Sequence, residues 1–178
     1  MIRGFKREMS TIFEMSDLGL LTYYLGIEVQ QHKGGITLKQ HRYATKILQE
    51  TGMQDCNAVH TPMEAGLVLS KSEHEQEVDE KEFRRSIGCL RYLLHTRPDL
   101  AYSVGLLSRY MHKPKSSHAA ALKQVLRYVR GTANYGLSFE RGTKMELVGY
   151  SDSSHNIDED DGRSTTGHIF YLNTCPIT

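Results

Sequence analysis

The sequence has no apolar run of about 18 residues, the length that a membrane-spanning helix requires. Residues 1–9, MIRGFKREM, become polar at once and lack the apolar core of a secretory signal peptide. We therefore expect neither a membrane partner nor a signal peptide.

Cysteine is also scarce, and no CxxC spacing occurs. The three cysteines, Cys56, Cys89 and Cys175, are far apart in the chain. An odd count without paired spacing argues against a disulfide framework and against a zinc site. We expect reduced thiols packed in the core, and a location in the cytosol or nucleus.

The chain has 178 residues, of which 39% are hydrophobic and 24% charged, enough for one domain or two small ones. Its charge is unevenly distributed. Residues 64–82 contain seven acids and two bases, a net charge of −5, whereas residues 84–131 contain ten bases and one acid, a net charge of +9. The basic block indicates either a phosphate-binding surface or a set of solvated helix faces.

The first part of the chain mixes helical and extended patterns. Apolar residues at helical spacing predict the end of a helix in 1–17. β-Forming residues in 23–29 and 36–38 flank Gly34-Gly35 and predict a β-hairpin. A short helix should follow at 41–51. The polar, acidic stretch 64–78 is the best candidate for a linker.

Three helices are predicted next, in 79–131. Asp79-x-x-Glu82 resembles a capping box, Pro98 suits the first turn of the second helix, and Ser117 is the expected cap of the third. Residues 135–140, 145–152 and 165–172 then have the pattern of three consecutive strands. The expected fold class is α+β: a β-hairpin plus helix, a three-helix segment and an antiparallel meander.

Six strings in order resemble the Pol polyprotein of Ty1/copia-type retrotransposons, which are common in plant genomes. They cover nearly the whole chain: FEMSDLG followed by YYLGIEV and GITLKQ in 13–40; TPM in 61–63; the segment from Phe83 to TRPDLA at 96–101; the segment from His118 to LRYVRGT at 126–132; GYSD in 149–152; and STTG in 164–167.

The resemblance implies a domain order. Residues 1–63 would be the end of the reverse transcriptase palm, with the primer-grip hairpin and the start of the thumb. Residues 64–78 would be an acidic linker, 79–133 the helical thumb and connection, and 134–178 the truncated start of a ribonuclease H-like domain. The remainder of the Pol polyprotein would be the partner of this segment in the parent protein.

The resemblance also implies that both active sites are incomplete. Two-metal polymerase chemistry in this family uses a Tyr-x-Asp-Asp turn, which is absent here and expected upstream of Met1. Asp152 matches the first ribonuclease H carboxylate and is the only candidate for a catalytic or metal-binding residue; the next is expected beyond Thr178. We expect Mg²⁺ in the intact parent enzyme, no cofactor in this fragment, and no catalysis by the chain alone.

Some residues depart from the family pattern or allow a second interpretation. Ser154 and His155 replace an Asp and a Trp, and Ala119 replaces the Trp after His118. The acidic run 158–161 is interpreted as a solvated turn rather than a cation site. His155 and His168 lack zinc spacing, and His118 is expected to start a helix rather than act as a base. For Tyr23, Tyr24 and Tyr43 we favour packing over base stacking.

Nucleic-acid binding is the activity that the chain itself could retain. Helical spacing places cations on the third helix opposite its apolar stripe, with further lysines just before it; the candidates are Lys113, Lys115, Lys123, Arg127 and Arg130. They would bind the backbone of an RNA–DNA hybrid or DNA duplex weakly and without sequence preference. The alternative is a secreted effector-like or host-reused interaction protein, but Gly88 and Gln124 stand where an Arg-x-Leu-Arg motif requires arginine.

Overall fold

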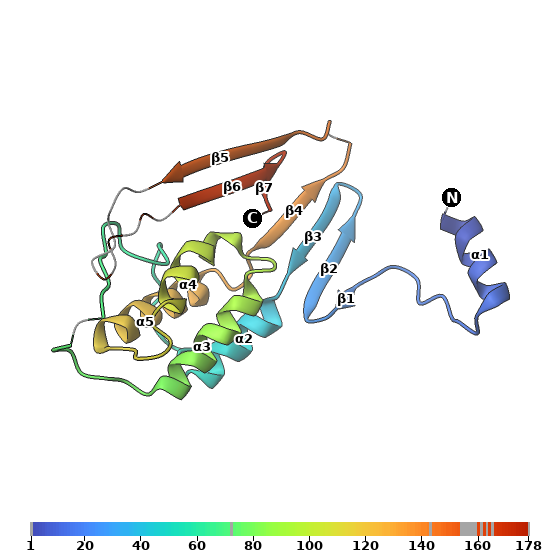
Figure 1. Cartoon of the computed structure of the whole chain (residues 1–178). Helices are drawn as coiled ribbons and strands as arrows, with labels where there is room; N and C mark the ends of the chain where they lie inside the picture. Colours follow the sequence, from blue (N-terminus) through green and yellow to red (C-terminus); the bar gives the residue numbers. More distant parts are fainter. Residues whose placement is uncertain are drawn as a thin grey trace.

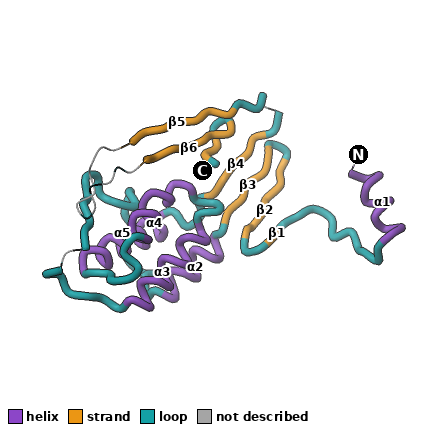
Figure 2. Tube along the Cα trace, in the orientation of Figure 1, coloured by secondary structure: helices purple, strands orange, loops and turns teal. Residues whose placement is uncertain are grey.

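The computed structural model describes residues 2–71, 73–142, 144–153, 160, 162, 164 and 166–177. It is a mixed helix and sheet structure with two antiparallel sheets, as the α+β fold class predicts (Figures 1 and 2). In the described part of the chain, no helix is both long and apolar enough to cross a membrane.

A bundle of helices, here called the helical body, forms the core. It consists of α2 (His41–Glu50), α3 (Glu80–Leu93), the 3₁₀ turn η1 (Pro98–Leu100), α4 (Ala101–Ser108) and α5 (Ser116–Gly131). The side chain of Asp79 caps α3 by accepting from the Glu82 amide, as the capping-box pattern predicts. Apolar side chains at helical spacing meet in the centre, where Ile87, Leu90 and Val125 are fully buried.

The first sheet lies against one end of the helical body (Figure 1). Its strands are β1 (Tyr23–Tyr24), β2 (Ile27–His32), β3 (Gly35–Lys39) and β4 (Gly136–Glu140), in that order. The β2–β3 pair confirms the predicted hairpin. A side chain at Gly136 would collide with the carbonyl oxygen of Leu38, so glycine permits the close approach of β4 to β3.

The second sheet, here called the ribbon, contains β5 (Leu147–Ser153), β6 (Thr166–Leu172) and β7 (Cys175–Pro176). The expected meander of three consecutive strands is wrong in its first member, because β4 pairs with β3 and not with β5. The hairpin offers an open strand edge next to the end of α5, and unpaired edge groups favour the addition of a strand there. Leu137 becomes buried as a result.

The acidic stretch expected to act as a linker is packed against the helical body. Leu69 is buried, the Val78 amide donates to the Pro114 carbonyl at 3.1 Å, and the Ser116 amide donates to Gln76 at 3.0 Å. Helix α5 begins at Ser116 with Lys115 as its N-cap, two residues before the predicted Ser117 cap. The predicted domain boundaries stay predictions.

Helix α1 (Ile2–Ile12) lies apart from the rest of the molecule (Figure 1). None of its residues is buried. An ion pair of 2.8 Å between Lys6 and Asp17 connects the helix to the following segment. That segment exposes several large apolar side chains, of which Leu18 is 93% exposed.

Candidate nucleic-acid interface

Helix α5 presents three of the predicted cations on its outer face. Lys123 and Arg130 are exposed and Arg127 is half-buried. The Nε–H of Arg127 donates to the Asn57 carbonyl at 2.7 Å, and that of Arg130 donates to the Gln54 carbonyl at 2.5 Å. Both arginines therefore hold the loop that follows α2. Among the described residues, neither guanidinium has another hydrogen-bond partner, so their terminal N–H groups stay available.

The two predicted lysines before α5 differ from each other. Lys113 is exposed. Lys115 is only 7% exposed, and its Nζ lies 3.1 Å from a carboxylate oxygen of Glu77. The prediction that Lys115 belongs to the phosphate-binding surface is wrong for this conformation, because its charge is already paired inside the protein. Charge counting along a sequence cannot reveal such a pair.

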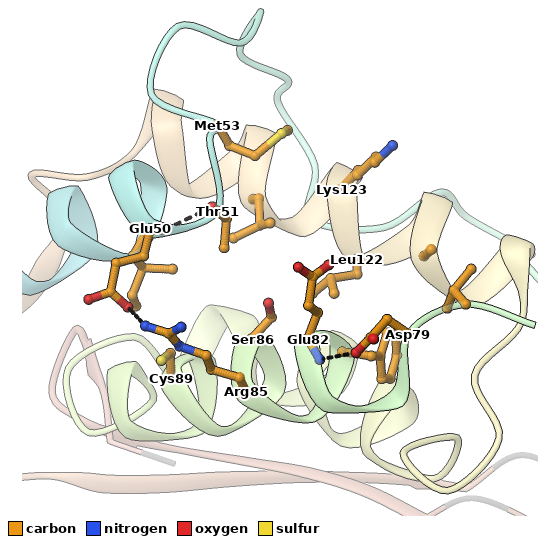
Figure 3. A pocket seen from close by; sticks show the side chains of 15 residues that line it. Glu50, Thr51, Met53, Asp79, Glu82, Arg85, Ser86, Cys89, Leu122 and Lys123 are labelled. Carbon is orange, nitrogen blue, oxygen red and sulfur yellow. Dashed lines mark hydrogen bonds and ion pairs between the residues drawn. The ribbon is translucent and has the colours of Figure 1, made fainter.

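A groove of about 260 Å³ lies between α2, α3 and α5 beside this basic face (Figure 3). Its floor is apolar, whereas its rim carries charges of both signs, including Glu82, Arg85 and Lys123. Arg85 is paired with Glu50 at 2.9 Å, and the Lys123 side chain points away from the groove (Figure 3). Such a mixed rim is not a continuous track for phosphates. Ala119 lines the wall.

The Thr96-Arg97-Pro98-Asp99 string, noted in the sequence only as a landmark of the family, forms a polar network around the buried Arg97 side chain. Arg97 is 2% exposed and donates to Asp99 at 2.7 Å and to the Thr132 carbonyl at 2.8 Å. Tyr128 donates to the same Asp99 carboxylate at 2.9 Å. Burial, followed by the nearby Asp99 charge, raises the pKa of Tyr128. The network joins the α3–α4 corner to the end of α5, which carries the basic face.

Asp152, the candidate carboxylate, is exposed near the end of β5, opposite Gly167 on β6. Its Oδ1 accepts the Ser153 amide at 2.8 Å. Among the residues that the structure describes, no group of three His, Cys, Asp or Glu side chains could hold a metal ion. His168 is paired in register with Ser151. His155 and most of the run 158–161 lie outside the described residues.

The predicted tyrosines separate into two kinds. Tyr43 packs edge-on against Tyr92 with 5.1 Å between ring centroids, and burial, followed by a hydrogen bond with Cys89, raises its pKa to about 12. Tyr23 and Tyr24 are 54% and 60% exposed. The expectation of packing is therefore wrong for these two tyrosines, because β1 lies at the edge of its sheet with little covering it.

Comparisons with known proteins show what this chain is similar to. A family described as reverse transcriptase (RNA-dependent DNA polymerase) matches residues 1–65. The Retrovirus-related Pol polyprotein from transposon RE1 of Arabidopsis thaliana is 40% identical over 96% of this chain, which spans 12% of that polyprotein. The chain thus falls in the class of reverse-transcriptase-related proteins. It belongs to the family of Ty1/copia-type retrotransposon Pol polyproteins.

Two further relatives are shorter. An uncharacterized mitochondrial protein of Arabidopsis thaliana is 38% identical over 93% of this chain and 68% of its own length. A protein named Secreted RxLR effector protein 161, from Plasmopara viticola, is 47% identical over 49% of this chain and 63% of its own length. The comparison with solved structures gives no match.

Proposed function

We propose that this chain is a nucleic-acid-binding segment of a Ty1/copia-type Pol polyprotein that has no complete active site of its own. One observation supports the binding role most: Lys123, Arg127 and Arg130 share the outer face of α5. Positions i, i+4 and i+7 place their charges along one line, as a phosphate backbone requires. The rest of the Pol polyprotein would supply the other contacts in the parent.

The two arginines are suited to phosphate because they are already oriented. Each uses its Nε–H on a loop carbonyl, which restricts the side chain and leaves the planar end of the guanidinium for a ligand. Such contacts position a nucleic acid but do not distinguish its bases. We therefore expect sequence-independent binding of an RNA–DNA hybrid or DNA duplex, with a Kd of about 10⁻⁴ to 10⁻⁶ M.

The absence of catalysis is proposed from the carboxylates. Two-metal nucleases and polymerases need several acidic ligands, and each Mg²⁺ demands near-octahedral oxygen geometry. The sequence contains no Tyr-x-Asp-Asp string, and Asp152 directs one oxygen to the Ser153 amide. The described residues therefore do not fit a two-Mg²⁺ site, and no reaction step is assigned to them.

A titration of labelled RNA–DNA hybrid at several salt concentrations tests the binding role. Replacing Lys123, Arg127 and Arg130 by Ala should weaken binding and flatten the dependence of log K on log salt by up to about three units. The matched control replaces Lys33, Arg141 and Lys144, three exposed cations outside α5, and removes the same net charge. If both triple variants weaken binding equally, α5 has no special role. If the unaltered chain does not bind at low salt, the proposed function is wrong.

The alternative is an effector-like or host-reused interaction protein. It is favoured by the partial match to the protein named as a secreted RxLR effector, which covers half of this chain. The absence of an Arg-x-Leu-Arg string in the sequence and the match to Pol polyproteins along nearly the full chain favour the first proposal. For this chain we propose a location in the cytosol or nucleus, because all three cysteines are free thiols.

A further inference from the structure

The segment of residues 69–71 and 73–78, here called the strap, crosses the start of α5 and is held there by side chains. Its carbonyl groups accept from the Tyr110 hydroxyl at 2.6 Å, through Leu69, and from a ring nitrogen of His118 at 3.0 Å, through Ser70. The Glu75 carboxylate accepts the Ser117 amide at 2.9 Å and so supplies a capping contact from outside the helix.

His118 is the centre of these contacts. It is fully buried and stacks on the Tyr110 ring with 3.9 Å between centroids. Its Nδ1 accepts the backbone N–H of Lys115, the N-cap of α5, at 2.9 Å. Because an imidazole nitrogen that accepts a hydrogen bond carries no proton, the proton must be on Nε2, which donates to the Ser70 carbonyl. Only this neutral tautomer satisfies both contacts.

Protonation of His118 would place a hydrogen on Nδ1 facing the Lys115 N–H. The helix would lose its capping contact, and two donors would point at each other in a buried space. We propose that His118 and the strap form a pH-dependent latch, which is closed over the start of α5 when His118 is neutral and opens when the imidazole is protonated.

The charged groups around the ring act in opposing directions. Burial is the largest influence and lowers the pKa of His118; the Ser70 contact and the carboxylates of Glu75 and Asp160 raise it, and Lys115 lowers it. Lys115 is itself paired with Glu77 from the strap. With burial dominant, the closed latch binds the proton less readily than the open one. The free energy that holds the latch closed is therefore complete above the ordinary pKa of 6.5 and decreases as the pH falls below it.

The two strap carboxylates that contact the start of α5 cannot produce the same response. The Ser117 amide holds the pKa of Glu75 below its ordinary 4.5, and the Lys115 ammonium does the same for Glu77. Both side chains therefore stay ionised between pH 8 and pH 5. His74 also lies on the strap, so a change in the strap within that interval is assigned to His118 only where His118→Gln abolishes it.

Hydrogen exchange of the full chain tests the latch through the amides of Val78, Ser116 and Ser117, which depend on strap contacts. After correction for the intrinsic exchange rate, their protection should fall between pH 8 and pH 5. The fall can reach about 30-fold, the limit set by an open-state pKa of 6.5. The amide of Leu90, in the core of α3, is the internal reference and should change little.

The matched variant is His118→Gln. Glutamine at this third helical position can accept the N-cap amide, as in a capping box, and does not titrate. Protection in the variant should be independent of pH over the same interval. The proposal is overturned if the protection of these amides in the native chain is the same at pH 5 as at pH 8. It is also overturned if His118→Gln loses as much protection as the native chain. If the variant does not fold, an NMR titration of His118 in the native chain decides. The imidazole must titrate below its ordinary pKa of 6.5, and titration at or above that value excludes the latch.

Discussion

The helical body and the ribbon bury their apolar side chains to very different extents. In the helical body, Leu90 and Leu107 are fully buried because four helices contribute to one core. In the ribbon, Leu147 and Tyr150 are 63% and 61% exposed, since a single layer of strands has few neighbours. Narrow antiparallel ribbons are marginal in water. The comparison teaches that stability is concentrated in α2–α5, and that the ribbon depends on contacts beyond its own strands.

The largest expected difference in the free energy of unfolding comes from truncating one leucine in each region. Leu90→Ala should lower the free energy of unfolding by about 2–5 kcal/mol, because it leaves a cavity in a close-packed core. Leu147→Ala should change it by no more than about 0.5 kcal/mol. Urea denaturation followed by circular dichroism measures both. Comparable losses in the two variants would mean that the ribbon is as well packed as the helices.

A smaller loss in the free energy of unfolding is expected when the polar network around Arg97 is altered. Arg97→Met removes the guanidinium donors to Asp99 and to the Thr132 carbonyl but keeps an unbranched side chain in the space, and Tyr128 still donates to Asp99. The Asp99 side chain is 36% exposed, so water can solvate part of its charge, and we expect a loss of about 2 kcal/mol. Arg91→Met, at an exposed site on α3, is the control. Equal midpoints in urea for the two variants would contradict a structural role for the network.

The smallest expected effect is an increase in the free energy of unfolding. Ala119 lines the groove between α2, α3 and α5, where a larger apolar side chain could cover the apolar floor. Ala119→Trp should stabilise the chain by about 1 kcal/mol, since buried apolar area outweighs the entropy of ordering one ring. The substitution should increase the difference in buried apolar area between the helical body and the ribbon. A lower thermal midpoint, with Ala120→Trp at a neighbouring exposed position as the control, would show that the groove cannot accept the ring.

The sequence alone predicted the structure correctly where a helix or hairpin depends on the residues of its own segment. The stripe of Phe83, Ile87 and Leu90 is buried as its helical spacing predicts, and the β2–β3 hairpin follows its glycine turn. Local periodicity is a property of the segment itself, so it can be recognised without the rest of the fold.

The failures concern partners that are distant in the chain. The pattern of β4 shows that it is a strand but does not show which edge it joins. The positive charge of Lys115 predicted that this residue belongs to a phosphate-binding surface. In the structure its charge is paired with Glu77 on the strap. The candidate interface was correct in placing Lys123, Arg127 and Arg130 on one helix face, but the loop carbonyls that two of them hold could not be inferred, because backbone acceptors have no sequence signature. Their role in binding stays a prediction.

The pairing of β4 with β3 has a consequence for the order of folding. Lys39 and Gly136 are neighbours in the sheet, although the whole helical body lies between them in the chain. Closing so long a loop in a disordered chain has a high entropic cost, and contacts of high sequence separation form slowly. We expect the helices to assemble first and shorten the path between the two strands, so that β4 joins the hairpin late.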